Sequence, residues 1–294
     1  TRVLRDHGER ARRKLDLPGM TCLGLGLFGV LWAMTKLAAS SLSASTATFL
    51  TGGLVLLIVF VVIEFRQAEP MLPMSIFRVP SMAPSLLASF FQGLANFAVL
   101  FLVIMYLQGP RGLSPIHASL LLVPGYVIGA GVGPYAGRLA DRYGPVLPAT
   151  LGLAIEVIAL LIYAQLGVQT GLWIVVVASV VNGVGASFFF PANNSAIMKA
   201  SPPKLFGISS GLLRTFSNIG MLFSFSVAIL IASRSISRGL AFAIFVGTTT
   251  LHGSLASAFT TGLHAAFYAS VGFMVLAAAL SAIRARGRAR IDNP

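Results

Sequence analysis

Six amide or charged side chains, among other polar residues, lie well inside long apolar stretches of this chain, where few polar partners are within reach. They are Gln92, Asn96, Glu156, Asn182, Arg214 and Asn218. Polar groups in such surroundings are costly to bury and tend to serve a function. Gln92 precedes Asn96 by four residues, so both lie on one face of a helix, and the same spacing relates Arg214 to Asn218. The amides suit binding of a small molecule, or else hydrogen bonds between helices.

Glu156 carries the kind of group that takes up and releases protons. It is the only acidic residue near the middle of an apolar stretch, so a proton-titrating site is one interpretation. A structural partner for Arg214 and a hydrogen bond between helices are the alternatives. Arg214 lies about two turns from the end of its stretch, so its long side chain could instead extend to water.

Composition places the chain among membrane proteins. Hydrophobic residues make up 56% of its 294 residues and charged residues only 10%, whereas soluble domains carry about 25% charged residues. The mean hydropathy is +0.87. A spanning helix needs roughly 20 apolar residues, and backbone groups in lipid must be satisfied internally. The predicted fold class is therefore all-α, a polytopic membrane helix bundle.

The residue pattern does not suggest an enzyme. The sequence shows no hydrolytic triad, phosphate-binding loop or metal-ligand spacing, and its one cysteine, Cys22, excludes a disulfide within the chain. Residues 24–29 match the dinucleotide pattern GxGxxG, but no βαβ unit surrounds them. We therefore expect no catalytic residues, no cofactor and no metal. The net charge of +13 comes from the ends of apolar stretches, so nucleic acid is not an expected partner.

Eight apolar stretches are predicted to span the membrane. Their approximate ranges are 16–38, 46–64, 82–107, 116–137, 146–166, 172–192, 207–232 and 258–282. The apolar segment 239–250 is too short to cross and is expected to be interfacial or re-entrant. With the N-terminus in the cytoplasm, sixteen Lys and Arg residues fall on the inner side and four on the outer side. This distribution follows the positive-inside rule and places both termini in the cytoplasm.

A charged sequence, Gly-Arg-Leu-Ala-Asp-Arg-Tyr-Gly at 137–144, is predicted to form a tight cytoplasmic turn between two spans. Along the preceding span, glycines at every fourth position form a smooth stripe. They are Gly125, Gly129, Gly133 and Gly137. Such a stripe predicts a close contact with a neighbouring helix, either fixed or sliding. Pro124 and Pro134 predict a bend in the same span.

Residues 137–144 resemble the cytoplasmic loop motif of the major facilitator superfamily, G-x-L-A-D-R-x-G-R-K. Other stretches are similar to its fourteen-span drug:proton antiporter branch. They are 69–73, 76–78, 191–198, Pro202, Gly207, 210–211 and 214–220. The resemblance implies that this chain is the C-terminal part of a longer transporter, spans seven to fourteen, and that an N-terminal six-helix half is missing. Pro145 and Val146 depart from the motif, at positions where the superfamily often has basic residues.

The resemblance also implies a domain organisation. Residues 1–15 would be a cytoplasmic basic segment, 16–66 a central two-helix insert and 67–81 a cytoplasmic connection. Residues 82–283 would form the C-terminal six-helix transporter half, followed by a basic cytoplasmic tail at 284–294.

Roles for individual residues follow from the same resemblance. In the superfamily, the charged motif locks helices together on the cytoplasmic side, so its residues become gate candidates. They are Gly137, Arg138, Asp141, Arg142 and Gly144. The first helix of each three-helix repeat lines a midplane cavity, which favours the amides of the third and sixth spans. The substrate-cavity candidates are Gln92, Asn96, Asn182, Arg214 and Asn218. The third helix of each repeat is peripheral, which makes Glu156 a weak candidate for the proton site.

The predicted function is secondary active transport across the bacterial inner membrane. The resemblance implies proton-coupled export of drugs or other amphipathic compounds by alternating access. The expected partners are a small amphipathic substrate, protons, the lipid bilayer and the missing N-terminal half. One alternative is the same fold exporting a metabolite, siderophore or lipid. Another is a complete eight-span channel or a non-transporting membrane protein. If the chain is a fragment, we expect it to be unable to transport alone, because half of the cavity is absent.

Overall fold

The computed structural model describes residues 16–39, 43–67, 76–77, 79–232, 240, 244, 250–251 and 253–289. Throughout this part of the chain the regular secondary structure is helical, as the composition predicted. The helices are α1 (Leu17–Ala39), α2 (Ala44–Arg66), α3 (Met82–Gln108), α4 (Pro115–Leu120), α5 (Val123–Tyr143), α6 (Val146–Tyr163), α7 (Leu172–Ala200), the short 3₁₀ helix η2 (Pro203–Leu205), α8 (Phe206–Ala232) and α10 (Ser254–Ala289).

The helices lie where the eight apolar stretches predicted them, and most ends agree within a few residues. Within the described residues, seven segments are long and apolar enough to cross a membrane, with α4 and α5 together forming one of them. The 27-residue helix α8 is not among the seven. The segment predicted to be interfacial or re-entrant, 239–250, falls almost entirely outside the described residues.

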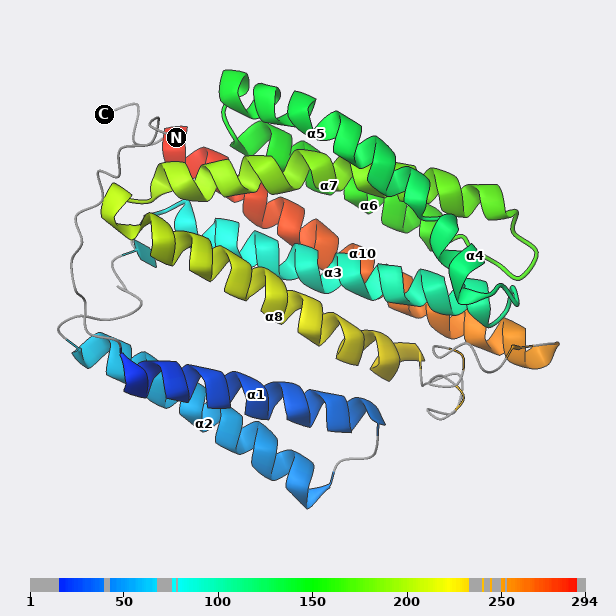
Figure 1. Cartoon of the computed structure of the whole chain (residues 1–294), viewed down its shortest axis with the longest axis horizontal. Coiled ribbons are helices and arrows are strands. Elements are labelled where there is room, and N and C mark those ends of the chain that lie inside the picture. The colour runs from blue at the N-terminus through cyan, green and yellow to red at the C-terminus, as the bar shows by residue number, and fades with distance from the viewer. Residues whose placement is uncertain are drawn as a thin grey trace, which may run out of the picture.

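Successive long helices run in opposite directions, so every second helix ends on the same side of the molecule. The C-terminal ends of α2, α5, α7 and α10 share one side, at the left of Figure 1. Basic residues occupy the last turns of three of them, at Arg66, Arg142 and Lys199. We call this side the basic end. The positive-inside rule predicts that it faces the cytoplasm.

The first two helices form a hairpin beside a bundle of the remaining ones (Figure 1). Glycines let α1 and α2 approach closely: a Cβ on Gly29 would lie 3.0 Å from the carbonyl oxygen of Phe49 and 3.1 Å from the Cα of Gly53. The glycines of 24–29 therefore include helix-contact residues, in agreement with the rejection of a dinucleotide site. The hairpin touches the bundle through α1 and α8.

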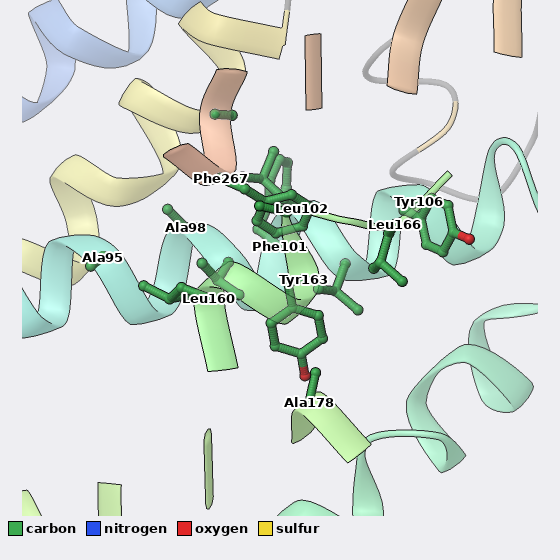
Figure 2. Packing of buried hydrophobic residues seen from close by; sticks show 14 of the residues in the cluster. Ala95, Ala98, Phe101, Leu102, Tyr106, Leu160, Tyr163, Leu166, Ala178 and Phe267 are labelled. Carbon is green, nitrogen blue, oxygen red and sulfur yellow. The ribbon is translucent and has the colours of Figure 1, made fainter. Parts of the chain in front are cut away.

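The bundle is held together by pairs of helices: α3 packs on α8 and α10, α7 packs on α5 and α6, and α6 packs on α10. Figure 2 shows the centre of the apolar core, where Phe101 and Leu102 of α3 meet Leu160 of α6 and Phe267 of α10. The ring of Tyr163 stacks on that of Phe267 with centroids 6.0 Å apart. In lipid such packing stabilises through van der Waals contact, because the surrounding tails are equally apolar.

The fourth predicted span is interrupted. It begins as α4, breaks at residues 121–122 and resumes as α5 with Pro124 in the first turn. Proline has no backbone N–H and its ring clashes with the preceding turn, so it starts a helix more readily than it continues one. Pro134 lies inside α5.

The charged motif is helical where a turn was expected. Residues 137–143 form the last two turns of α5, and only Gly144 and Pro145 separate α5 from α6. Gly144 has φ +81 and ψ 161. Only glycine adopts this region readily, so Gly144 permits the reversal of chain direction.

Candidate functional site

A cavity of about 460 Å³ opens between α3, α5 and α7, with one side chain contributed by α6. Its walls are mainly apolar, from residues such as Leu100, Val103 and Phe190. Its polar wall groups are Gln92, Asn96, Tyr126, Tyr163, Ser179, Asn182 and Ser187. An apolar cavity with a few convergent polar groups has the form of a small-molecule site. Three of the predicted substrate-cavity residues, Gln92, Asn96 and Asn182, thus line one cavity.

Glu156 lies directly behind the amide side of this cavity. Its side chain is fully buried on α6. The Gln92 Nε2 donates to both carboxylate oxygens, at 3.3 Å to Oε1 and 3.2 Å to Oε2. The Asn96 Nδ2 donates to Oε2 at 3.2 Å. A buried carboxylate is therefore held by two neutral amides, which themselves form part of the cavity wall.

Glycines on α6 and α7 allow this arrangement. A Cβ on Gly185 of α7 would lie 2.7 Å from the Cγ of Glu156 and 2.8 Å from the carbonyl oxygen of Gly152. Conversely, a Cβ on Gly152 would lie 2.6 Å from the Gly185 oxygen. The two backbones thus meet closely at the level of Glu156, and the small residues leave room for its side chain against α7.

The hydrogen bonds of Glu156 distinguish between the structural roles considered for this residue. The interhelical hydrogen bond is present, because the amides of α3 reach the carboxylate of α6. Arg214 is not a partner within the described residues, since its side chain is exposed on α8. The expectation of a peripheral Glu156 came from the helix order alone, whereas in the structure one layer of amides separates its carboxylate from the cavity.

Asn182 has an unsatisfied donor in the cavity wall. Its Nδ2 is buried and has no hydrogen-bond partner among the described residues. A buried amide left without a partner is costly, by about 1–3 kcal/mol. An acceptor group on a ligand in the cavity would satisfy it.

Arg214 and Asn218 lie apart from this cavity. Both are exposed on α8 and neither belongs to the cavity wall. Helix α8 packs against α3 through small residues, where a Cβ on Gly93 would lie 2.7 Å from the Ser217 oxygen. The assignment of Arg214 and Asn218 to a substrate cavity stays a prediction.

Half of the glycine stripe on α5 is in helix contact. A Cβ on Gly125 would clash with the carbonyl oxygen of Ser179, and one on Gly129 would lie 2.8 Å from that of Gly183. The hydroxyl of Ser187 also donates to the Gly129 oxygen at 2.6 Å. Apart from the helix's own neighbouring backbone, no atom of the described residues lies within 4 Å of a Cβ built on Gly133 or Gly137. The α5–α7 contact is therefore tight at Gly125 and Gly129, whereas Gly133 and Gly137 face open space.

The gate candidates sit at the basic end. Arg138, Asp141 and Arg142 are exposed, and none of the five gate candidates lines the cavity. The Arg138 guanidinium lies 5.7 Å from the centroid of the Tyr135 ring, and that of Arg142 lies 5.3 Å from the Tyr143 ring. Each of these arginines thus lies over a tyrosine ring of its own helix, α5. Their role as a gate stays a prediction.

A buried arginine was missed by the sequence analysis. Arg284, expected at the start of the cytoplasmic tail, is only 2% exposed and belongs to α10. Its Nη1 donates to Ser85 Oγ at 2.8 Å and to Asn193 Oδ1 at 2.6 Å, and its Nη2 donates to Ser281 Oγ at 3.0 Å. Asn193 in turn donates to Ser89 Oγ at 2.7 Å. The guanidinium thus ties α3, α7 and α10 together.

The only signal for this role in the sequence is that Arg284 continues the apolar run of the last span without a break. The Arg284 Nε has no partner in the described residues.

Comparison with known proteins gives the family. The sequence profile of the Major Facilitator Superfamily matches residues 17–225. A lincomycin resistance protein, LmrB, of Listeria monocytogenes is 27% identical over 257 residues, which are 86% of this chain and 53% of that protein. A tetracenomycin C resistance and export protein of Streptomyces glaucescens is 26% identical over 77% of this chain and 42% of its own length. The multidrug efflux pump LfrA of Mycolicibacterium smegmatis is 27% identical over 65% of this chain and 38% of its own.

The fold agrees with a solved structure. The crystal structure of a bacterial homolog of the human lysosomal transporter Spinster, in an inward-facing and occupied conformation, superposes with a TM-score of 0.56. The two chains are 19% identical, and the match covers 92% of this chain and 67% of the other. This chain spans about half the length of the curated relatives it matches. It is an integral membrane protein with several membrane-spanning helices. The family whose profile it matches consists of transporters and not of enzymes. Because the profile covers most of its length, the chain belongs to the Major Facilitator Superfamily.

Proposed function

We propose that this chain forms the C-terminal part of a proton-coupled exporter of drugs or other amphipathic compounds that works by alternating access. The observation that carries the proposal is the amide-lined cavity backed by the buried carboxylate of Glu156. The apolar walls suit the hydrophobic part of an amphipathic compound, and the polar groups orient it. Relatives named for drug resistance and multidrug efflux support this substrate class.

The proposed organisation places α1 and α2 as the central insert between two six-helix halves, and α3 to α10 as the C-terminal half. The separate hairpin beside the bundle supports this division (Figure 1). Spans seven to fourteen of a fourteen-span transporter would correspond to the described helices. A missing N-terminal half would supply the other side of the substrate pathway, and the basic end would face the cytoplasm of a bacterial inner membrane.

Glu156 is the proposed proton acceptor in this chain. A carboxylate enclosed by neutral amides has no cation among the described residues to hold its charge, so taking up a proton removes a buried charge without breaking an ion pair. Gln92, Asn96 and Asn182 are the proposed substrate contacts. Asp141, Arg138 and Arg142 at the basic end are the proposed gate.

Transport assays in a pump-deficient bacterial host test the proposal. The gene that encodes this chain, with whatever coding sequence precedes it in frame, is expected to raise resistance to amphipathic drugs. Everted vesicles are expected to accumulate the drug when a proton gradient is imposed and to lose it when the gradient is collapsed. Glu156→Gln should abolish this response to the gradient.

Glu64→Gln provides a matched control, because it removes another buried carboxylate from α2, outside the cavity. Accumulation by Glu156→Gln at the wild-type rate would refute the proton role of Glu156. If a metabolite, siderophore or lipid were accumulated while drugs were not, the cargo would be reassigned and the transport class kept. Absence of any transport by wild type would favour the channel or non-transporting alternative.

A further inference from the structure

Two side chains of α3 belong to two sites at once. Gln92 and Asn96 form part of the cavity wall, and the same two amides hold the carboxylate of Glu156. Their separation of four residues places both on the face of α3 that meets α6 and the cavity. A change in the protonation of Glu156 therefore affects which hydrogen-bonding groups Gln92 and Asn96 present to the cavity.

An amide offers different groups at its two ends. The nitrogen carries two hydrogen-bond donors and the oxygen is an acceptor. In this structure both nitrogens are used on the carboxylate, because Gln92 Nε2 and Asn96 Nδ2 lie 3.2–3.3 Å from its oxygens. No hydrogen bond reaches the oxygen of either amide among the described residues. With Glu156 ionised, the amide oxygens are thus the groups left for a ligand in the cavity.

Protonation reverses this pattern. A proton that reaches the carboxylate from water adds to one of its oxygens, and the new O–H becomes a donor. An amide that turns its oxygen towards Glu156 accepts that hydrogen, and Gln92 and Asn96 are the hydrogen-bond partners of the carboxyl among the described residues. Rotation of an amide by 180° exchanges oxygen and nitrogen with almost no change of shape, so the turn requires no movement of the helices. The nitrogen of that amide then becomes the group left for the cavity.

We propose that the protonation state of Glu156 sets whether the amide wall of the cavity accepts or donates hydrogen bonds, and that the cavity thereby prefers substrates with N–H donors, such as ammonium or amidinium compounds, when Glu156 is ionised. The inference rests on the proposed function and names its substrate class. Uptake of a proton turns an acceptor wall into a donor wall and releases such a substrate. Proton and substrate then exclude one another without binding to the same atoms.

Several other titratable groups lie around α6. Tyr163 on α6 stacks on Phe267, and Tyr126 of α5 lies in the cavity wall. On α10, His264 contacts the Leu166 oxygen at 2.7 Å through Nε2. Tyr268 accepts from Gln165, and Arg284 is bonded to Ser85, Asn193 and Ser281. From α7, the neighbour of Glu156 is Gly185, which carries no charge. His264 is the histidine among these groups, so its substitution is a necessary control.

The binding experiment compares two cations on the purified full chain in lipid nanodiscs across a pH series. Ethidium carries N–H donors, whereas tetraphenylphosphonium has none. The Kd for ethidium is expected to rise about tenfold as pH falls, which corresponds to losing one hydrogen bond. The Kd for tetraphenylphosphonium should change much less. An equal pH response of the two probes would mean that only the charge of Glu156 matters, and would overturn the amide switch.

Single substitutions test which residue causes the pH dependence of ethidium binding. Glu156→Gln should remove the pH response of ethidium binding, and Gln92→Leu should reduce it. Asn182→Ala should keep the pH response, because Asn182 lines the same cavity and its amide nitrogen has no hydrogen-bond partner, Glu156 included, among the described residues. His264→Gln should behave as wild type. A wild-type pH response in Glu156→Gln would overturn the inference while leaving the proposed cavity intact.

Infrared spectroscopy on the ligand-free chain tests the switch separately from binding. The low-minus-high pH difference spectrum is expected to contain a protonated-carboxyl band that is absent in Glu156→Gln. It should also contain a shift of side-chain amide bands that is diminished in Gln92→Leu. A carboxyl band without any amide shift would contradict the inference. If wild type bound neither cation, the proposed substrate class would be wrong. The infrared spectra alone would then show whether the amides turn when Glu156 takes up a proton.

Discussion

Gly185→Ala is the substitution that tests the geometry around Glu156 most directly. The added Cβ would lie 2.7 Å from the Glu156 Cγ, 2.8 Å from the Glu156 backbone nitrogen and 2.8 Å from the Gly152 oxygen. Carbon atoms in contact lie about 3.5 Å apart or more, so the clash with Cγ alone requires about 0.8 Å of movement. Two of the three atoms belong to the backbone, so a side-chain rotation cannot relieve the clash and α6 must move away from α7.

Overpacking of this kind costs about 1–3 kcal/mol in the free energy of unfolding. The movement also acts on Glu156, because its hydrogen bonds of 3.2–3.3 Å are already at the long end of the normal range. We therefore expect Gly185→Ala to lower the free energy of unfolding and to weaken the hydrogen bonds from Gln92 and Asn96 to the carboxylate.

The assay is equilibrium unfolding in mixed detergent micelles, followed by circular dichroism. Gly131→Ala is the matched control, since no neighbouring helix in the described part of the chain comes within 4 Å of a Cβ built on this glycine of α5. The control should be neutral or stabilising by up to about 1 kcal/mol, because alanine is the better helix former. If Gly185→Ala unfolded at the same denaturant concentration as Gly131→Ala, the close approach of α6 and α7 at Glu156 would be wrong.

Three further predictions concern single positions. Arg284→Met should lower the free energy of unfolding by about 1–3 kcal/mol, because it leaves the buried oxygen of Asn193 without its donor. A double-mutant cycle with Asn193→Ala should show strong coupling between the two positions. Additive effects of the two substitutions would argue against the contact. Asn182→Leu should leave stability unchanged or raise it, because it removes a buried donor that has no partner in the described residues, while ligand affinity measured by fluorescence titration falls about fivefold. Gly144→Ala should cost about 1–3 kcal/mol of unfolding free energy, because alanine is strained at φ +81; Gly137→Ala, with normal helical backbone and open space, should be close to neutral, and equal losses in the two variants would contradict the role of backbone conformation.

The position of Glu156 shows that the make-up of a site depends on more than the order of the helices. By its place in the third helix of a repeat, the residue was expected to be peripheral and was a weak proton candidate. The structure puts one layer of amides between its carboxylate and the cavity. Helix order predicts which helices are neighbours, but the rotation of each helix about its axis decides which side chains meet.

The gate motif gives the opposite case. Its residues identify the superfamily clearly, and the charge pattern predicts the side of the membrane on which it lies. Yet the structure makes most of the motif a helix end, with the arginines over tyrosine rings of their own helix. A sequence motif gives the types and order of the residues, whereas the group that each charged side chain contacts depends on where the other helices end.

The sequence by itself determined the helical class, the approximate ends of the long helices and the face shared by Gln92 and Asn96. These are local properties: hydropathy over about 20 residues predicts a span, and a separation of four residues places two side chains on one helix face. The expectation that Gln92, Asn96 and Asn182 line a cavity came from the superfamily resemblance, which implies that their helices face it, and not from local chemistry.

Only the tertiary structure decided that Glu156 meets those amides and that Arg284 is buried among Ser85, Asn193 and Ser281. These contacts join residues more than 50 positions apart, with the exception of Ser281. They depend on how closely two helices approach, which Gly152 and Gly185 set for α6 and α7. In an apolar solvent, hydropathy does not distinguish a residue that faces lipid from one that faces another helix, so packing alone makes that choice.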